Sequence, residues 1–180
     1  MTIRRWRLLA LILVLGPLAV ACSMEETLPP PRCAGGGSEL IVAQSVPTAE
    51  LVPCLGILPD GWTVDRVRVD QDGSLVRLDS DRAGFGAARL LFRRQCDTAD
   101  AVPVPTDQNE AVAYEAIGRI RPGFLGRRIY VFDGGCVVWE FDFDPDASAT
   151  LAIDLQARLT LVPRSEINQS IRENFIDEEL

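Results

Sequence analysis

The sequence feature that most constrains the fold is a pair of alternating segments joined by two glycines, within residues 128–143. Gly134 and Gly135 follow Asp133, and adjacent glycines favour a type I′ turn, which needs positive φ at both central residues. Beyond the turn, apolar residues occur at every second position, the period of a strand with one face in the core. The apolar set is Val137, Trp139, Phe141 and Phe143, and the alternating set is Val138, Glu140, Asp142 and Asp144. This pattern predicts a β-hairpin with one apolar face and one solvated face.

Four other segments are predicted to be strands, because they are rich in apolar or alternating residues and are bounded by turn residues. They are residues 62–69, 75–78, 87–96 and 111–120. Asp72-Gly73 marks a turn between the first two segments. Pro103 and Pro105 interrupt any strand ladder, which places residues 97–109 in a loop.

Helices are predicted near both ends of this region. Thr48 is suited to cap a short helix over residues 49–52. Residues 147–162 fit both a strand and a helix, and the cap-like run Asp146-Ala147-Ser148 favours a helix. A second short helix is expected over residues 165–174.

The expected fold class is therefore α+β, an antiparallel sheet of about five strands with flanking helices. It occupies one domain over residues 40–174, and the acidic residues 175–180 form a frayed tail.

The N-terminus has the three parts of a signal peptide: a basic start, an apolar run and small residues before a cleavage point. A start with three arginines precedes an apolar run over residues 8–15, which Gly16-Pro17 ends. The run is shorter than the roughly 20 apolar residues needed to cross a bilayer. Residues 1–21 are therefore predicted to be a signal peptide that is cleaved during export.

The run Leu18-Ala19-Val20-Ala21-Cys22 resembles the lipobox of bacterial lipoproteins. The resemblance implies that Cys22 receives a diacylglycerol thioether and becomes the first residue of the mature chain. The protein would then be lipid-anchored at the outer face of the cytoplasmic membrane. An ordinary secretory signal with a chance cysteine is the alternative. Residues 22–39 are predicted to be a tether, because their proline run favours extended geometry and their glycine run a flexible coil.

Lipidation of Cys22 would leave four of the five cysteines, an even set that favours two disulfide bonds in an oxidising compartment. Cys96 ends a predicted strand and Cys136 follows the hairpin turn, so neighbouring antiparallel strands would bring them within bonding distance. Cys33 and Cys54 remain as the second pair, although the sequence alone allows other pairings. A zinc site made of all four is the alternative, but they lack the close spacing of zinc ligands.

The chain contains no histidine and no lysine, and all 18 basic residues are arginine. This composition excludes Ser-His-Asp and Cys-His catalysis, histidine-ligated zinc enzymes and lysine Schiff-base chemistry in their usual forms. No cofactor or metal is expected. Removal of residues 1–21 takes away three of the 18 arginines, which leaves 15 against 26 acidic residues and a net charge of −11. Such a chain repels nucleic-acid phosphates, and no nucleic-acid partner is expected.

A candidate catalytic site consists of carboxylates on one face of the second hairpin strand. Glu140, Asp142 and Asp144 alternate along that strand, and alternate residues lie roughly 6 to 7 Å apart. Paired acids of a glycosidase need a separation of this order. A solvated polar face explains the same pattern without chemistry.

A candidate anion-binding patch consists of arginines from two distant segments. They are Arg89, Arg93, Arg94, Arg127 and Arg128. Arginine clusters bind carboxylates and phosphates through paired N–H donors. Surface ion pairs with neighbouring acids are the alternative in so acidic a chain.

Four further motifs lie within about residues 44–143: Ser45-Val46-Pro47-Thr48-Ala49 with Cys54, Leu58-Pro59-Asp60-Gly61-Trp62, Asp81-Arg82-Ala83-Gly84 and Tyr130-Val131-Phe132-Asp133-Gly134-Gly135-Cys136. Together they resemble a family of uncharacterised actinobacterial lipoproteins. The resemblance implies an extracytoplasmic location and disulfide bonds only, because the family has no assigned activity. We therefore expect a non-enzymatic module, held on the membrane by its lipid, that binds a protein or another envelope ligand or helps to assemble the envelope. A histidine-free envelope hydrolase acting through Glu140 and Asp142 is the alternative.

Overall fold

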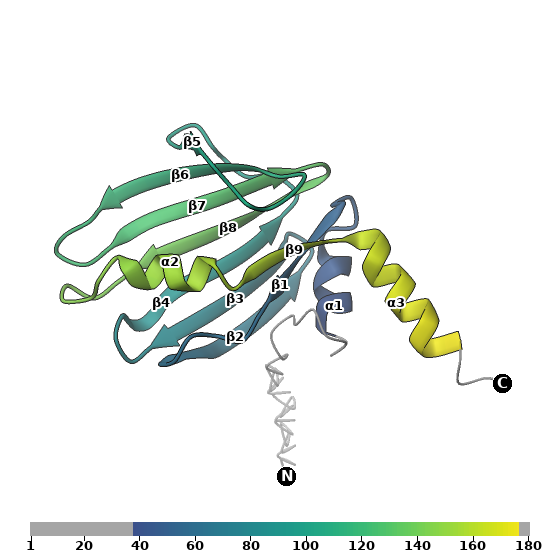
Figure 1. Cartoon of the computed structure of the whole chain (residues 1–180), viewed down its shortest axis with the longest axis horizontal. Helices are drawn as coiled ribbons and strands as arrows, with labels where there is room; N and C mark the ends of the chain where they lie inside the picture. The colour runs from purple at the N-terminus through teal and green to yellow at the C-terminus, as the bar shows by residue number, and fades with distance from the viewer. Residues whose placement is uncertain (1–37, 177–180) are drawn as a thin grey trace, which may run out of the picture.

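The computed structural model describes residues 38–176, and the predicted signal peptide, Cys22 and Cys33 lie outside the described residues. Within them, one antiparallel sheet has the strand order β2-β3-β4-β8-β7-β6-β5 (Figure 1). Its strands are β2 (Trp62–Asp70), β3 (Gly73–Ser80), β4 (Gly84–Arg93), β5 (Val102–Val104), β6 (Val112–Arg119), β7 (Leu125–Phe132) and β8 (Gly135–Asp142). Consecutive strands are neighbours except after β4, where residues 94–101 carry the chain to β5 at the far edge.

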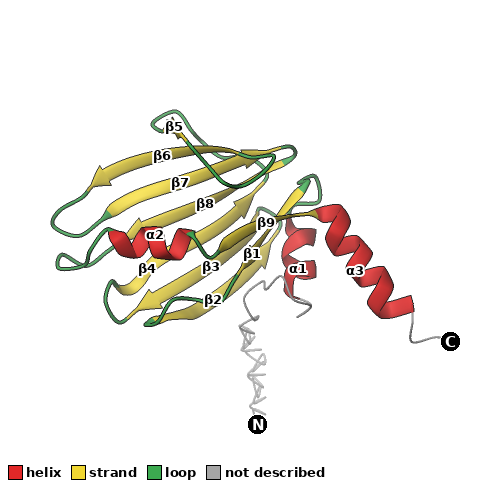
Figure 2. Cartoon of the chain, viewed as in Figure 1, coloured by secondary structure: helices red, strands yellow, loops and turns green. Residues whose placement is uncertain are grey.

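A second layer lies on one face of this sheet (Figure 2). It consists of helix α1 (Ser38–Ser45), helix α2 (Thr150–Gln156) and an antiparallel ribbon of β1 (Leu51–Leu55) and β9 (Leu159–Pro163). The C-terminal helix α3 (Arg164–Ile176) follows β9 and extends away from the sheet (Figure 1). The domain is thus a sheet with one covered face.

The core lies between the two layers. Trp139, Phe92 and Phe141 are its largest fully or almost fully buried side chains, and the Trp139 and Phe141 rings stack with centroids 5.8 Å apart. Leu55 of the ribbon and Leu155 of α2 close the core from the second layer. Burial of each such side chain contributes about 1.5–3 kcal/mol. The predicted alternation along β8 is confirmed, because its apolar set faces this core.

The hairpin between β7 and β8 is present, but its turn is one residue earlier than predicted. Phe132 pairs with Gly135, so the central residues are Asp133 and Gly134, and Gly135 already belongs to β8. Of these two central residues only Gly134 has a positive φ, 71°, and the type I′ prediction is therefore wrong. Glycine is needed there for a second reason: a Cβ on Gly134 would overlap the carbonyl oxygen of Thr48.

The number of strands and the first helix also differ from expectation. Seven strands form the main sheet and two form a separate ribbon, against about five expected in one sheet. Residues 49–52, predicted as a helix, include the first two residues of β1, whose five residues are all buried. Instead of capping a helix, Thr48 donates from Oγ1 to the Gly134 carbonyl oxygen at 2.7 Å. A short continuous apolar run does not distinguish a buried strand from a buried helix, which explains the error.

The ambiguous residues 147–162 divide into helix α2 and most of strand β9. The helix prediction is right for α2, whose Leu151 and Leu155 are buried, and wrong for the residues that pair with β1. The Gln108 side chain holds β9 in place, since it donates a hydrogen bond to Leu159 O at 3.2 Å and accepts one from Leu161 N at 2.9 Å. Helix α3 confirms the predicted C-terminal helix.

Candidate functional site

The face of the sheet opposite the second layer carries rows of charged side chains. Residues paired across neighbouring strands share a face, so the strand register arranges them in rows. One row runs Arg77 on β3, Arg89 on β4, Glu140 on β8 and Arg127 on β7. Like charges directly opposite each other, such as Arg77 and Arg89, are unfavourable unless anionic groups offset them. Two acids do so here: Asp65 lies 3.4 Å from Arg77 Nε, and Glu140 lies 3.1 Å from Arg89 Nε.

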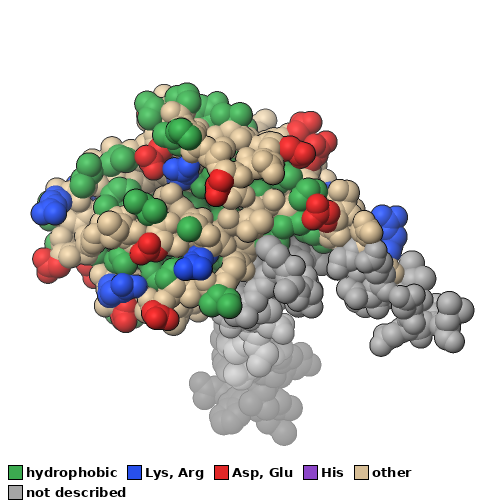
Figure 3. All heavy atoms as spheres, viewed as in Figure 1, with side chains coloured by type: hydrophobic (Ala, Val, Ile, Leu, Met, Phe, Trp, Pro, Cys, Tyr) green, Lys and Arg blue, Asp and Glu red, His purple; other side chains and the backbone are tan. Residues whose placement is uncertain are grey.

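The second-layer side of the molecule looks different. Charged side chains are scattered there, and apolar side chains gather over β5 at the edge of the sheet (Figure 3). Val102 of β5 is 63% exposed. Single exposed apolar residues of this kind are common on protein surfaces and mark no site by themselves.

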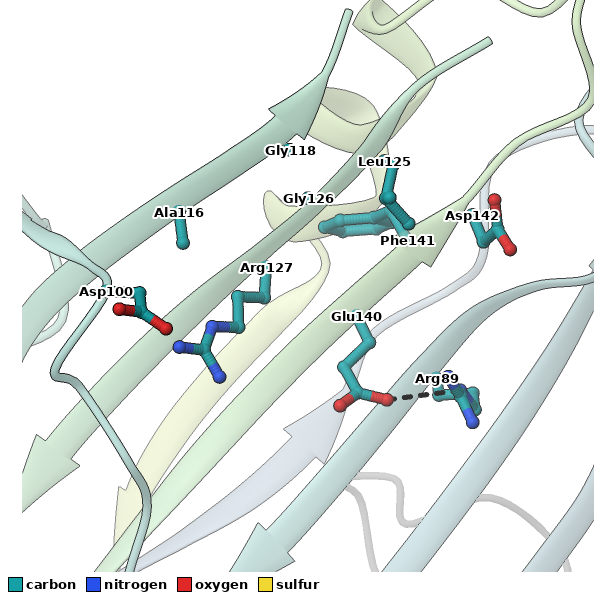
Figure 4. Close-up of a pocket in the computed structure, with 10 residues that line it drawn as sticks. All are labelled: Arg89, Asp100, Ala116, Gly118, Leu125, Gly126, Arg127, Glu140, Phe141 and Asp142. Carbon is teal, nitrogen blue, oxygen red and sulfur yellow. Dashed lines mark ion pairs between the residues drawn. The ribbon is translucent and has the colours of Figure 1, made fainter.

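The charged face contains a hollow beside Arg127 (Figure 4). The hollow has a volume of about 400 Å³ and opens to solvent. Its floor exists because β6 carries the small residues Ala116 and Gly118 where neighbouring strands carry long side chains. The Arg127 side chain points into the space between Asp100 on the 94–101 segment and Glu140 on β8 (Figure 4). Charges from parts of the chain far apart in sequence therefore meet in one hollow.

A disulfide bond fixes the segment that supplies Asp100. Cys96 and Cys136 are bonded, with Cα atoms 6.1 Å apart, and this confirms the predicted pair. Cys136 alternates with Gly135 and Val137 along β8, so the bond lies on the charged face and holds residues 94–101 against it. A turn then places Asp100, since Ala101 N donates to the Thr98 carbonyl oxygen at 3.0 Å. This wall of the hollow is covalently braced.

Of the arginines at the hollow, two form ion pairs and one does not. Arg89 holds Glu140, and Arg119 Nη2 lies 3.4 Å from Asp142 Oδ1. Arg127 is half-buried, yet its side chain makes no ion pair or hydrogen bond with any residue that the structure describes. None of the Arg127 side-chain nitrogens is among the buried polar atoms without a partner, so the guanidinium group meets solvent in the hollow. The hollow therefore presents a cation that has no partner among the described side chains.

The structure brings together only part of each predicted cluster. Of the carboxylates, Glu140 and Asp142 line the hollow and Asp144 does not. Of the arginines, Arg89 and Arg127 line it. Arg128 lies on the other face, where it donates to the Pro105 carbonyl oxygen at 2.7 Å.

Sequence reasoning missed Asp100 and the small floor residues. Asp100 lies in a segment read only as a loop, and no local pattern places it opposite Arg127. The alternation of Ala116 and Gly118 along a predicted strand was the one available signal for a hollow, since small residues leave space on a sheet face.

The other predicted site residues lie elsewhere. Cys22 and Cys33 are outside the described residues. Cys54 is buried in β1, opposite Thr160 of β9. The Cys33–Cys54 bond therefore stays a prediction.

Among the described residues, the side chains with shifted pKa values lie away from the hollow. Burial raises the pKa of Tyr130, and the positive charge of Arg128 opposes that rise. Burial lowers the pKa of Arg164, whose guanidinium donates to carbonyl oxygens of Ala43 and Ala49. These contacts tie the start of α3 to α1 and the residues after it.

No helix between residues 38 and 176 is long and apolar enough to span a bilayer. The same residues contain no cluster of three or more His, Cys, Asp or Glu side chains suited to hold a metal ion. Comparison with known proteins found no family model, no curated protein and no solved structure that matches the chain. The resemblance to actinobacterial lipoproteins therefore stays a prediction from the sequence.

Proposed function

We propose that the protein is an extracytoplasmic lipoprotein, anchored through a lipid on Cys22, whose charged sheet face binds a ligand of the cell envelope without catalysis. The lipobox-like run before Cys22 and the basic, apolar start of the chain support the anchor. The cysteine count supports it independently, because lipidation of Cys22 leaves an even set for disulfide bonding.

The open hollow beside Arg127 carries the binding role. Enzyme pockets usually enclose most of a small substrate and exclude water. This hollow opens to solvent on a sheet face, and its charged groups are set by strand register and a disulfide bond. Glu140 and Asp142 are each engaged by an arginine, an arrangement that supports recognition by charge.

Metabolic labelling with an alkyne fatty acid tests the anchor. The wild-type protein is expected to take up the label and to fractionate with membranes, and Cys22→Ser is expected to do neither. Equal labelling of the two proteins would contradict the proposal.

Site-specific photocrosslinking in intact cells tests the binding face. A photoreactive residue at Leu125, a wall of the hollow that is 39% exposed, is expected to capture an envelope component. The control position is Ile153 on α2, which is 66% exposed on the second-layer side. Crosslinks from Ile153 alone, or equal crosslinks from both positions, would contradict a binding role for the charged face.

We further propose that Cys33 is bonded to Cys54, which would be the second disulfide of the fold. Cys54 lies in the ribbon, so the bond would join the tether to the second layer. Non-reducing peptide mapping tests this pairing. A Cys33 peptide linked to Cys96 or Cys136, or a reactive Cys33 thiol in exported protein, would contradict it.

The alternative function is a carboxylate-based hydrolase of the envelope. The presence of Glu140 and Asp142 in one hollow is the observation that favours it. Hydrolysis of purified envelope polymer by the wild type, abolished in Glu140→Gln and in Asp142→Asn, would establish the enzyme and overturn the non-enzymatic proposal.

A further inference from the structure

We infer that the hollow beside Arg127 binds a zwitterionic ligand, an amino acid or short peptide that carries a free carboxylate and a free ammonium group. The inference rests on the proposed binding role of the charged face. It adds the chemical class of the ligand.

The anionic end of the ligand is assigned to Arg127. On one side Arg127 pairs in register with Glu140, a carboxylate that already contacts Arg89, and on the other with Ala116, which offers no polar group. Every other half-buried arginine among the described residues has an ion pair or a hydrogen bond. The planar guanidinium fork matches a carboxylate, which it can bind through two parallel N–H donors.

The cationic end is assigned to Asp100. This exposed carboxylate lines the same hollow and makes no ion pair within the described part of the chain. Asp142 adds a second negative charge at the rim, where its side chain is 68% exposed. These acids repel a ligand with several negative charges and attract an ammonium group.

The two charges without partners are therefore opposite in sign and face one hollow. A ligand whose carboxylate binds Arg127 and whose ammonium group binds Asp100 pairs with both of these side chains at once. A simple anion satisfies Arg127 alone and meets repulsion from the acids.

The hollow is large enough for such a ligand and needs little ordering to bind it. Its volume of about 400 Å³ suits a small molecule or a few atoms of a larger one. The Cys96–Cys136 bond and the turn at Thr98 hold Asp100 in place, so little ordering is needed on binding. Leu125 provides an apolar wall for a side chain of the ligand.

The test is an NMR titration of the mature chain, residues 22–180 with Cys22→Ser, using four probes. They are alanylalanine, its C-terminal amide, its N-acetyl derivative and inorganic phosphate. Alanylalanine is expected to cause saturable shifts of the backbone amides around Gly118, Gly126 and Arg127. Each capped derivative lacks one charge and is expected to bind about tenfold more weakly, as is phosphate.

Variants assign each end of the ligand. Arg127→Ala is expected to bind alanylalanine about tenfold more weakly than the wild type does. It is also expected to bind alanylalanine and its C-terminal amide with equal affinity, because the partner of the ligand carboxylate is gone. Asp100→Asn is expected to bind alanylalanine and its N-acetyl derivative with equal affinity, because the partner of the ligand ammonium group is gone. Arg158→Ala removes an exposed arginine outside the hollow and is expected to bind like the wild type. The spectra report folding of each variant.

Phosphate binding as tight as that of alanylalanine would overturn the inference, and so would capped derivatives that bind as tightly as the parent. Absence of saturable shifts would also overturn it. If Leu125 crosslinking stays specific in that case, the ligand class is wrong and the binding role stands. Loss of the Leu125 crosslinks would instead reject the binding role itself.

Discussion

The two faces of the seven-stranded sheet come from the same strands and have opposite chemistry. On β8, Trp139 and Phe141 of the covered face are 0% and 2% exposed. Between and after them, Glu140 and Asp142 of the other face have side chains that are 36% and 68% exposed. Buried apolar side chains supply most of the folding free energy, whereas exposed ion pairs contribute about 0–1 kcal/mol each. Alternate positions on one strand therefore have different roles: the buried ones stabilise the fold, and the exposed ones are the ones to which we assign the proposed binding.

The largest effect is expected on the covered face. Trp139→Ala removes the largest fully buried side chain and is expected to lower the free energy of unfolding by about 3–5 kcal/mol. Glu140→Ala, one position along, is the matched control, and a loss under about 1 kcal/mol is expected because its ion pair is partly solvated. Urea unfolding measures both. Equal losses would show that the two faces do not divide these roles.

The disulfide bond is the expected exception, since it stabilises the fold from the charged face. Its cysteines are 40 residues apart, and a loop of that size contributes roughly 4 kcal/mol on a chain-entropy model. The double variant Cys96→Ser, Cys136→Ser is expected to approach that loss and to release residues 94–101. Thermal unfolding under oxidising conditions measures it, with Arg127→Ala as the control that leaves the bond intact. A loss below about 1 kcal/mol would contradict the structural role of the bond.

A smaller effect is expected at the turn that joins β7 and β8. Gly134→Val puts a branched side chain at positive φ and against the Thr48 carbonyl oxygen, and should cost on the order of 2 kcal/mol or more. Gly118→Val is the control, because its Cβ would meet Leu125 at an ordinary 3.4 Å and its φ is not positive. Differential scanning calorimetry compares the two. An unchanged melting temperature for Gly134→Val would show that the turn is placed wrongly.

The smallest effect concerns the ion pair between Arg89 and Glu140. Glu140→Gln is expected to change stability by less than about 1 kcal/mol, and added salt should shrink the difference. A double-mutant cycle with Arg89→Gln measures the coupling between the two side chains. A salt-independent coupling above about 2 kcal/mol would mean that this face also holds the fold together.

Local patterns identified the parts of the molecule that depend on neighbours in sequence. The alternation in β8 predicted which side chains are buried, because residue spacing alone decides which face a strand residue occupies. The same hairpin brought Cys136 beside the end of β4, so the Cys96–Cys136 bond was predictable. The turn was misplaced by one residue, because two adjacent glycines permit more than one turn position and the contact with Thr48 comes from a distant loop.

The sequence by itself determined the alternating strands and the absence of histidine- and lysine-based catalysis, and it favoured the Cys96–Cys136 pair that the structure confirms. Only the tertiary structure decided that residues 51–55 form a strand, because their partner β9 lies beyond the whole seven-stranded sheet in the sequence. The tertiary structure also brings Asp100, Arg127 and Glu140 together around one hollow. Pairing between strands that are distant in the sequence sets these contacts, and this pairing depends on burial against segments that no local pattern specifies.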